Sequence, residues 1–264
     1  MTGLVRWLET AGRPVMDLME VTGACVLLAL RVVDRLVRKP WPWRQLGPQV
    51  AAIGTDSLPI ALVTALSVGM VFTLQISNEF QRFGASSVIG GVAGIALVRE
   101  LIPTLTGVVV AGRVGAAIAA ELGAMQVTEQ VDALTAMAAD PVRILVAPRV
   151  LACLAVLPML TMIADVVGLA GGFGVAVQLK GLAAVRFLDS LQGLVRLEDV
   201  LKGLLKAAWF GLVVGVIGSQ RGLSATAGAR GVGRATTEAV VYSLITIFVT
   251  NYLLSAWLFP GGAR

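Results

Sequence analysis

The side chains with the greatest chemical potential in this sequence are charges inside long apolar runs. Arg99 and Glu100 are adjacent and stand one turn before Pro103, while Asp165 interrupts another apolar stretch. A charge inside a bilayer is costly, so such residues usually face a polar cavity or a partner. Neighbours on a helix point in different directions, so Arg99 and Glu100 need not pair with each other. Pathway lining and a structural ion pair both stay open for them. Asp165 is equally consistent with a hydrogen-bonded structural carboxylate and with a functional one.

The sequence lacks the usual means of catalysis. Histidine is absent, which excludes an imidazole base and a His-ligated metal, and the only cysteines, Cys25 and Cys153, are interpreted as packing residues. No Gly-Lys dipeptide occurs, so there is no phosphate-binding G-x-x-x-x-G-K-[ST] loop. The glycine-rich, basic run 228–234 lacks that lysine and is interpreted as a flexible cytoplasmic turn. We expect no catalytic residue, metal or cofactor in this chain.

Composition places the chain in a membrane. Of 264 residues, 57% are apolar and 14% are charged, against about 25% charged residues in a soluble domain. A mean hydropathy of +0.86 is too high for one soluble core of this size, and it excludes disorder. The predicted class is an all-α, polytopic membrane protein. The net charge of +5 fits basic loops kept on the cytoplasmic side better than nucleic-acid binding.

Long apolar runs predict five transmembrane helices within a single domain, 1–264. Their predicted limits are 54–78, 88–120, 143–178, 203–221 and 237–259. Near the start of the fourth span, Lys206 is expected to extend its ammonium toward the membrane surface. Residues 1–47 are predicted to be an interfacial segment. Its amphipathic helix over 4–36 is broken at 39–44 by prolines among tryptophans, and a plain cytoplasmic tail is the alternative.

Basic residues set the predicted orientation. Seven of them precede the first span, which favours a cytoplasmic N-terminus and, after five spans, an external C-terminus. No signal peptide is evident. We expect a multi-pass protein of a bacterial inner (plasma) membrane, with a plastid protein as the alternative. Small residues recur every four positions from Gly107 to Gly123, and also at Gly168 and Gly172 and at Gly211 and Gly215. This spacing is typical of tightly packed membrane helices.

An acidic segment follows the second span. Residues 121–140 contain four acidic residues and no basic one, and apolar residues at Val127, Val131, Leu134 and Ala138 share one helical face. The pattern predicts a helix over 124–139, capped by Thr128, with a new helix starting at Asp140-Pro141. Such a helix is either a solvated loop helix or a docking helix for a soluble partner.

Several of these motifs together resemble the MlaE/YrbE family, the permease subunits of MCE-linked ABC transporters that move lipids between membranes. The resemblance rests on RELIP at 99–103, AGRVG at 111–115, AELGAMQVTEQVDAL at 120–134, Asp140-Pro141, Pro148-Arg149 and the stretch 228–241. It covers about residues 45–260. It implies a homodimer, a dimer of cytoplasmic ABC ATPases that bind ATP and Mg²⁺, an MCE-protein ring on the outer face, and phospholipid or a related lipid as cargo.

The resemblance also assigns an ATPase-coupling role to the acidic helix. The coupling residues would be Glu121, Val127, Thr128, Glu129, Gln130, Val131, Asp132 and Leu134. Arg99 and Glu100 would line the lipid pathway with Leu74, Gln75 and Asn78 near the outer end of the first span. Glu100 precedes Glu121 by 21 residues, or roughly 31 Å of helix, so we expect it near the outer membrane boundary, or deeper if Pro103 kinks the helix.

Two other classes of function remain as alternatives. An ion- or proton-coupled secondary transporter of an amphiphilic solute would show internal repeats and broken helices with acids near the midplane, and Asp165 fits this weakly. A membrane-embedded lipid-modifying enzyme is disfavoured by the missing histidine and by the lack of clustered polar residues.

Overall fold

The computed structural model describes residues 2–38, 43–226 and 228–259, and every regular element in these ranges is a helix. Five helical segments are long and apolar enough to cross a membrane, which confirms the all-α polytopic class. These segments are Gln45–Arg82, Ser86–Val127, Val142–Leu179, Leu197–Leu223 and Gly228–Leu258. Each overlaps one predicted span and is longer than it, by one residue at each end for the third and by nine residues at the start of the fifth, so the run 228–234 is helical and not the predicted flexible turn. About 20 residues suffice to cross the hydrocarbon, so all five segments are long enough.

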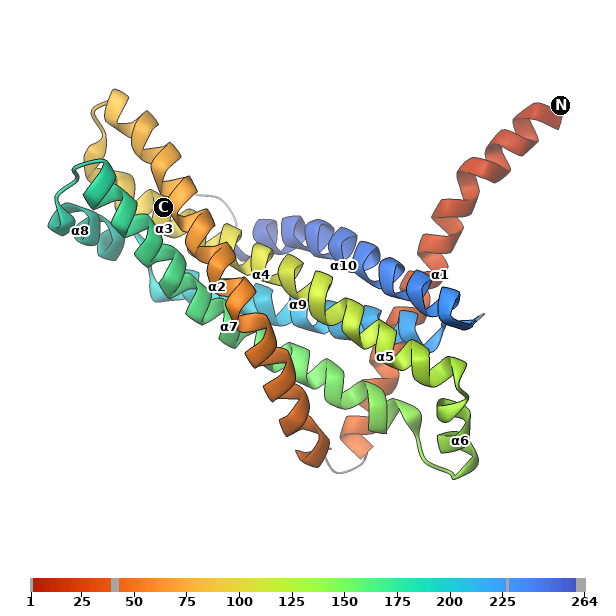
Figure 1. Ribbon diagram of the computed structural model, residues 1–264. Helices are drawn as coiled ribbons and strands as arrows, with labels where there is room; N and C mark the ends of the chain where they lie inside the picture. Colours follow the sequence, from red (N-terminus) through yellow and green to blue (C-terminus); the bar gives the residue numbers. More distant parts are fainter. Residues whose placement is uncertain (1, 39–42, 227, 260–264) are drawn as a thin grey trace.

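The five segments are built from unequal pieces. The first is α2 (Trp43–Arg82), the fourth α9 (Leu197–Leu223) and the fifth α10 (Gly228–Leu258). The second is a succession of α3 (Ile89–Ala96), α4 (Ile102–Val110) and α5 (Ala116–Val127), preceded by the short 3-10 turn η1 (Ser86–Val88). The third is mainly α7 (Ala147–Gly174). Short helices α6 (Gln130–Ala136) and α8 (Ala184–Leu194) lie at opposite ends of the bundle (Figure 1).

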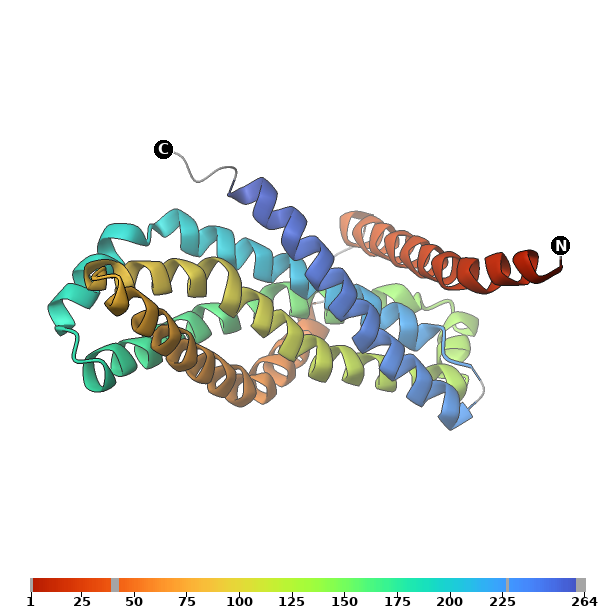
Figure 2. The ribbon, with the colours of Figure 1, turned by 90° about the horizontal axis from the view of Figure 1, so that it is seen from above.

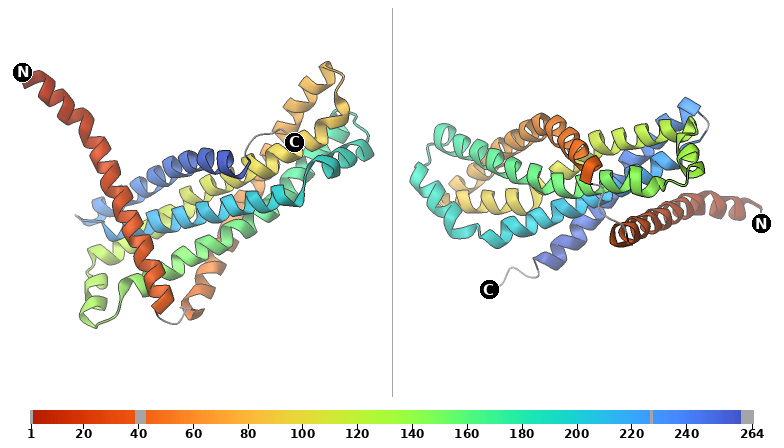
Figure 3. Two further views of the ribbon diagram at one scale, coloured as in Figure 1. Left: turned by 180° about the vertical axis from the view of Figure 1, so that it is seen from behind. Right: turned by 90° about the horizontal axis from the view of Figure 1, so that it is seen from below.

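Helix α1 (Thr2–Arg38) leaves the bundle at an angle. It crosses one side of the bundle, and its N-terminal part extends away from the other helices (Figure 3). Its Leu28 and Val32 are buried against Val146 and Val150 of the third segment. Farther along, Arg35 Nε lies 2.7 Å from Asp140 Oδ2. The predicted break at 39–44 falls mostly on residues 39–42, which lie outside the described part of the chain, and α2 begins at Trp43.

In the described residues, four π-helical stretches belong to the second and third segments, two inside the second and one at each end of the third. They are η2 (Leu97–Leu101), η3 (Ala111–Gly115), η4 (Val142–Val146) and η5 (Val175–Leu179). In η2 the Ile102 N–H donates to the Leu97 carbonyl, five residues back, and Pro103 follows directly. A π-bulge rotates the residues that follow it and occurs often at functional sites. The local change at Arg99 and Glu100 is therefore a π-turn just before Pro103, in addition to the proline kink that the sequence analysis allowed for.

Helix α9 occupies the middle of the bundle and packs against α4, α5, α7 and α10 (Figure 2). Its glycines make this approach close. A Cβ on Gly211 would overlap the carbonyl oxygen of Cys153 in α7, and one on Gly215 would lie 2.9 Å from the Val150 Cα. Helices α2 and α7 also cross in close backbone contact, because a Cβ on Gly69 would overlap the backbone at Gly168. These contacts agree with the close packing predicted from the small-residue stripes.

Substitution of Gly211 by alanine tests the packing. The new methyl group has no space against the Cys153 carbonyl, so Gly211→Ala should lower the free energy of unfolding by about 1–3 kcal/mol. Gly174→Ala, in α7 with no atom near its Cβ position, is the matched control and should be neutral or mildly stabilising. Thermal unfolding in detergent measures both. Equal melting temperatures for the two variants would contradict the proposed role of α9 packing.

Candidate functional site

A network of charges joins the second segment to α9. Arg99 Nε donates to Asp199 Oδ1 at 2.9 Å, and Arg99 Nη2 lies 2.7 Å from the same oxygen. The other oxygen of Asp199 accepts the backbone N–H of Arg196 at 2.9 Å, at the start of α9. Asp199 is 3% exposed. One buried carboxylate therefore both caps α9 and holds Arg99, which fixes the start of α9 against η2.

The companion pair joins Glu100 to Lys206, whose side chain is fully buried. The Lys206 ammonium has three protons and finds three acceptors: Glu100 Oε2 at 2.8 Å, Ser255 Oγ at 2.7 Å and the Arg99 carbonyl at 3.1 Å. Its hydrogen-bonding capacity is thus filled inside the protein. The prediction that Lys206 reaches toward the membrane surface is wrong, because α9 is packed too tightly at this point and Glu100 offers an ionic partner.

Arg99 and Glu100 remain partly accessible despite these bonds. Their side chains are 32% and 39% exposed, and the Phe259 ring lies 4.7 Å from the Arg99 guanidinium carbon. Asn251 also reaches Glu100, with its Nδ2 at 3.4 Å from Oε2. The two side chains form ion pairs with α9, and none with each other. Their exposed edges leave room for contact with a passing polar group, so the structural role and the pathway role are compatible.

Sequence analysis missed the partners of this cluster. Asp199 and Lys206 are seven residues apart and share one face of α9, while Asn251 and Ser255 are four apart on α10. The available signal was that Asp199 and Lys206, two charges of opposite sign, share one helix face. These charges match those of Arg99 and Glu100, but the sequence alone does not say which helices are neighbours.

The three candidate pathway residues on α2 are placed differently from one another. Gln75 is exposed and Leu74 is half-buried. Asn78 Oδ1 accepts a hydrogen bond from the Lys180 ammonium at the end of the third segment. Arg99 and Glu100 bond instead to α9 and α10, so no hydrogen bond described in the structure joins them to the α2 group.

At the other end of the bundle, the acidic segment is divided into two helices. Helix α5 ends at Val127, and α6 starts after Glu129, whose backbone is left-handed with φ of 61°. The predicted single helix over 124–139 is therefore wrong. So is the predicted cap, since Thr128 Oγ1 donates back to the Ala124 carbonyl at 2.8 Å. The turn is needed because the chain must reverse at the bundle end to start the third segment.

The acidic side chains of this end fall into two groups. Two are bonded to the bundle: Glu121 Oε2 lies 2.9 Å from Arg149 Nη2, and Asp140 pairs with Arg35. Asp140 Oδ1 also accepts the Val142 N–H at 3.1 Å, which confirms its predicted capping role. The second group, Glu129 and Asp132, is exposed and carries the negative charge of α6 outward.

Apolar residues hold α6 in place. Val131 is 8% exposed, and Leu134 packs against the same core. Of the predicted coupling residues, the bundle therefore covers Val131 and most of Leu134, and Val127 is half-buried. The polar members, Thr128, Glu129, Gln130 and Asp132, are exposed on α6 and the turn before it. A rigidly docked helix with a polar outer face can transmit a push to α5 and α7, which it joins.

Two other sequence features are buried. Cys153 lies in the core, as predicted for a packing residue. Asp165 is 5% exposed, and neither carboxylate oxygen has a hydrogen-bond partner in the part of the chain that the structure describes. Among the same residues, no group of three or more His, Cys, Asp or Glu side chains gathers where it could hold a metal ion.

The Glu100–Lys206 pair gives a quantitative test of the charged cluster. Glu100→Gln removes the carboxylate that pairs with a fully buried ammonium, so it should cost about 3 kcal/mol of unfolding free energy. Combining it with Lys206→Met should recover most of that loss, because no unpaired charge then remains. Glu198→Gln, which breaks an exposed pair with Lys202 at 3.8 Å, is the control and should cost under about 1 kcal/mol. Strictly additive effects of the two cluster substitutions would refute the coupling.

Comparison of the sequence with known proteins identifies its family. Residues 46–257 match the family described as Permease MlaE. A probable ABC transporter permease protein of Synechocystis is 49% identical over 213 residues, covering 81% of each chain. One of Rickettsia typhi is 40% identical over 248 residues, covering 94% of this chain and 96% of its own.

A plant protein is similar as well. The chloroplastic protein TRIGALACTOSYLDIACYLGLYCEROL 1 of Arabidopsis thaliana is 41% identical over 235 residues, which cover 89% of this chain and 67% of its own length. The family match spans all five membrane segments, the charged cluster and α6. The chain therefore belongs to the MlaE permease family and is the permease subunit of an ABC transporter.

Proposed function

We propose that this permease moves phospholipid or a related lipid between membranes, with ATP hydrolysed by a separate subunit. The observation that carries the proposal is the partly exposed charged cluster of Arg99 and Glu100 toward one end of a bundle of long apolar helices. An amphiphile needs both features, since its tails favour apolar walls and its headgroup favours charged groups. The Arabidopsis relative, whose name contains that of a lipid, supports the same class of cargo.

The transporter would work as a homodimer. A chain of 27.4 kDa with five spans is small for enclosing a two-tailed lipid, and two copies would give a symmetric pathway between them. The charged cluster would lie toward the outer face, where an MCE-protein ring would receive or deliver the lipid. The N-terminus would be cytoplasmic and the C-terminus external, in a bacterial inner membrane.

Helix α6 would dock the cytoplasmic ATPase, which binds the ATP and Mg²⁺. Its support is geometric: the helix is fixed to the bundle by Val131 and Leu134 and presents exposed Glu129 and Asp132. It also connects α5 with the third segment, so movement of the ATPase would be passed to two membrane helices at once.

Charge reversal tests the docking. Glu129→Lys together with Asp132→Lys should abolish copurification of the ATPase, because two attractive contacts become repulsive. Membrane insertion should be unchanged, since both side chains are exposed. Glu79→Lys, an exposed acid on α2 at the opposite end, is the matched control and should keep the ATPase bound. An unchanged yield of complex from the double variant would argue against the docking role.

Photocrosslinking tests the pathway without breaking the ion pairs. Gln75 is exposed on α2, in the half of this helix that leads to Arg82. A photoreactive amino acid at position 75 should label phospholipid during ATP-driven transport. The same amino acid at Met162, 59% exposed on α7, serves as the control for lipids that merely surround the protein. ATP-dependent labelling at position 75 but not at 162 is the expected result. Equal labelling at both positions, with and without ATP, would refute the assignment of the pathway.

A further inference from the structure

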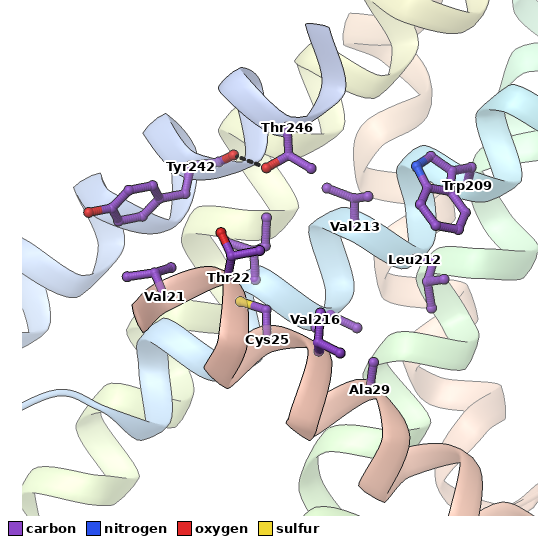
Figure 4. Close-up of a pocket in the computed structure, with 12 residues that line it drawn as sticks. Val21, Thr22, Cys25, Ala29, Trp209, Leu212, Val213, Val216, Tyr242 and Thr246 are labelled. Carbon is purple, nitrogen blue, oxygen red and sulfur yellow. Dashed lines mark hydrogen bonds between the residues drawn. The ribbon is translucent and has the colours of Figure 1, made fainter. Parts of the chain in front are cut away.

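A cavity lies between α1 and the bundle, near the end that carries α6. Its volume is about 270 Å³, and its wall is almost entirely apolar. Three helices contribute to it, and their side chains converge on a common space (Figure 4). Representative lining residues are Cys25 and Ala29 from α1, Leu212 and Val216 from α9, and Tyr242 and Thr246 from α10.

A second, polar cavity of about 340 Å³ adjoins the first, since Val21 and Tyr242 line both. Its wall includes Arg221 near the end of α9 and Arg234 and Glu238 near the start of α10. The apolar and polar spaces therefore follow one another along the helices, with the polar one toward the helix ends. Small-molecule sites commonly occupy about 300–1,000 Å³, so the joined space is large enough for part of an amphiphile.

The polar cavity has unused hydrogen-bonding capacity. Arg221 and Arg234 both pair with Glu238, and Glu20 also lines this cavity. The buried Arg221 Nε and the Gln220 Oε1 have no hydrogen-bond partner in the described residues. The Arg221 Nε–H can therefore donate to an anionic oxygen, and phosphate is an anion that arginine binds well.

The dimensions match one leaflet of a bilayer. Trp209, at the inner limit of the apolar cavity, precedes Arg221 by 12 residues, which corresponds to about 18 Å of helix. Half of a hydrocarbon core is about 15 Å thick. An acyl chain in the apolar cavity would thus keep its headgroup at the level of Arg221. Val26 and Trp209 are 54% and 43% exposed, so the cavity has an open edge through which a lipid can enter from the side.

We infer that this joined cavity binds one phospholipid from the leaflet at the α6 end, with an acyl chain between α1 and α9 and its phosphate at Arg221. The site is separate from the Arg99–Glu100 cluster, which lies at the opposite end of α9. It goes beyond the proposed transport function and does not depend on what the cargo is. A bound lipid would fill the space between α1 and the bundle and so set the angle of α1.

Photolabelling of the full-length protein tests the inference. The protein is reconstituted in vesicles of phosphatidylethanolamine and phosphatidylglycerol with a trace of phosphatidylethanolamine that carries a diazirine in one acyl chain. After illumination, labelled positions are mapped by mass spectrometry. We expect labelling around residues 21–29 of α1 and 209–217 of α9, above the level at exposed Met159 and Met162 of α7, which report on bulk lipid. Equal labelling of both regions would overturn the inference.

Matched variants separate a specific site from general membrane contact. Ala29→Trp fills the cavity and should strongly reduce its labelling, while Leu30→Trp, on the exposed side of α1, should not. Val26→Trp on the open edge offers a second obstruction at an exposed position, with Leu27→Trp as its control, in case Ala29→Trp does not fold. Unchanged labelling in a folded obstructed variant would refute the site.

The headgroup contact has its own test. Arg221→Gln removes a charged donor and should reduce labelling about tenfold, while Arg221→Lys should retain more of it. Equal labelling of wild type, Arg221→Gln and Arg221→Lys would overturn the phosphate assignment. A free fatty acid with the same diazirine should label the cavity weakly. Labelling by the fatty acid as strong as by the phospholipid would also overturn that assignment, because a single carboxylate would then suffice.

Discussion

The close approach of α9 to its neighbours is the constraint on which this structure depends. Lipid tails are as apolar as leucine, so the hydrophobic effect does not bring membrane helices together, and contact between backbones must supply the attraction. On α9, Gly211 and Gly215 face α7, while Gly218 and Gly222 face the second segment. Each side of the helix can therefore touch a different neighbour without a side chain between them.

Close packing has an electrostatic consequence at the start of α9. With neighbours so near, Asp199 and Lys206 cannot reach water, and each needs an ionic partner in place. The partners come from one π-helical turn, η2, in which Arg99 pairs with Asp199 and Glu100 pairs with Lys206. A regular helix would direct these two side chains differently, so the π-turn and the ion pairs belong to one arrangement.

The opposite end of the bundle presents an exposed acidic surface on α6. Helix α6 is short, bracketed by left-handed residues at Glu129 and Ala138, and fixed by a small apolar contact. Non-glycine residues with positive φ carry a conformational cost, which the surrounding packing must offset. The bundle thus has a partly exposed charged cluster at one end and an exposed acidic surface at the other. The polar part of the joined cavity between α1 and the bundle, with Arg221 and Glu238 in its wall, adds a third polar site near the α6 end.

The sequence by itself determined the class of fold, the number of membrane segments and the motifs of the family. These follow from local properties, namely runs of apolar residues, small-residue spacing and a few charges, each readable without knowing any neighbour. The capping role of Asp140 was predictable for the same reason, since a cap involves residues only two apart.

Only the tertiary structure decided how the charges are partnered and which faces are free. Lys206 was expected to reach toward the membrane surface, yet it is buried because glycine packing brings η2 and α10 against it, and Glu100 and Ser255 complete its shell. The division of the acidic segment at Thr128 and Glu129 likewise follows from the need to reverse the chain between α5 and the third segment. Both outcomes depend on contacts between residues distant in sequence, which local patterns do not encode.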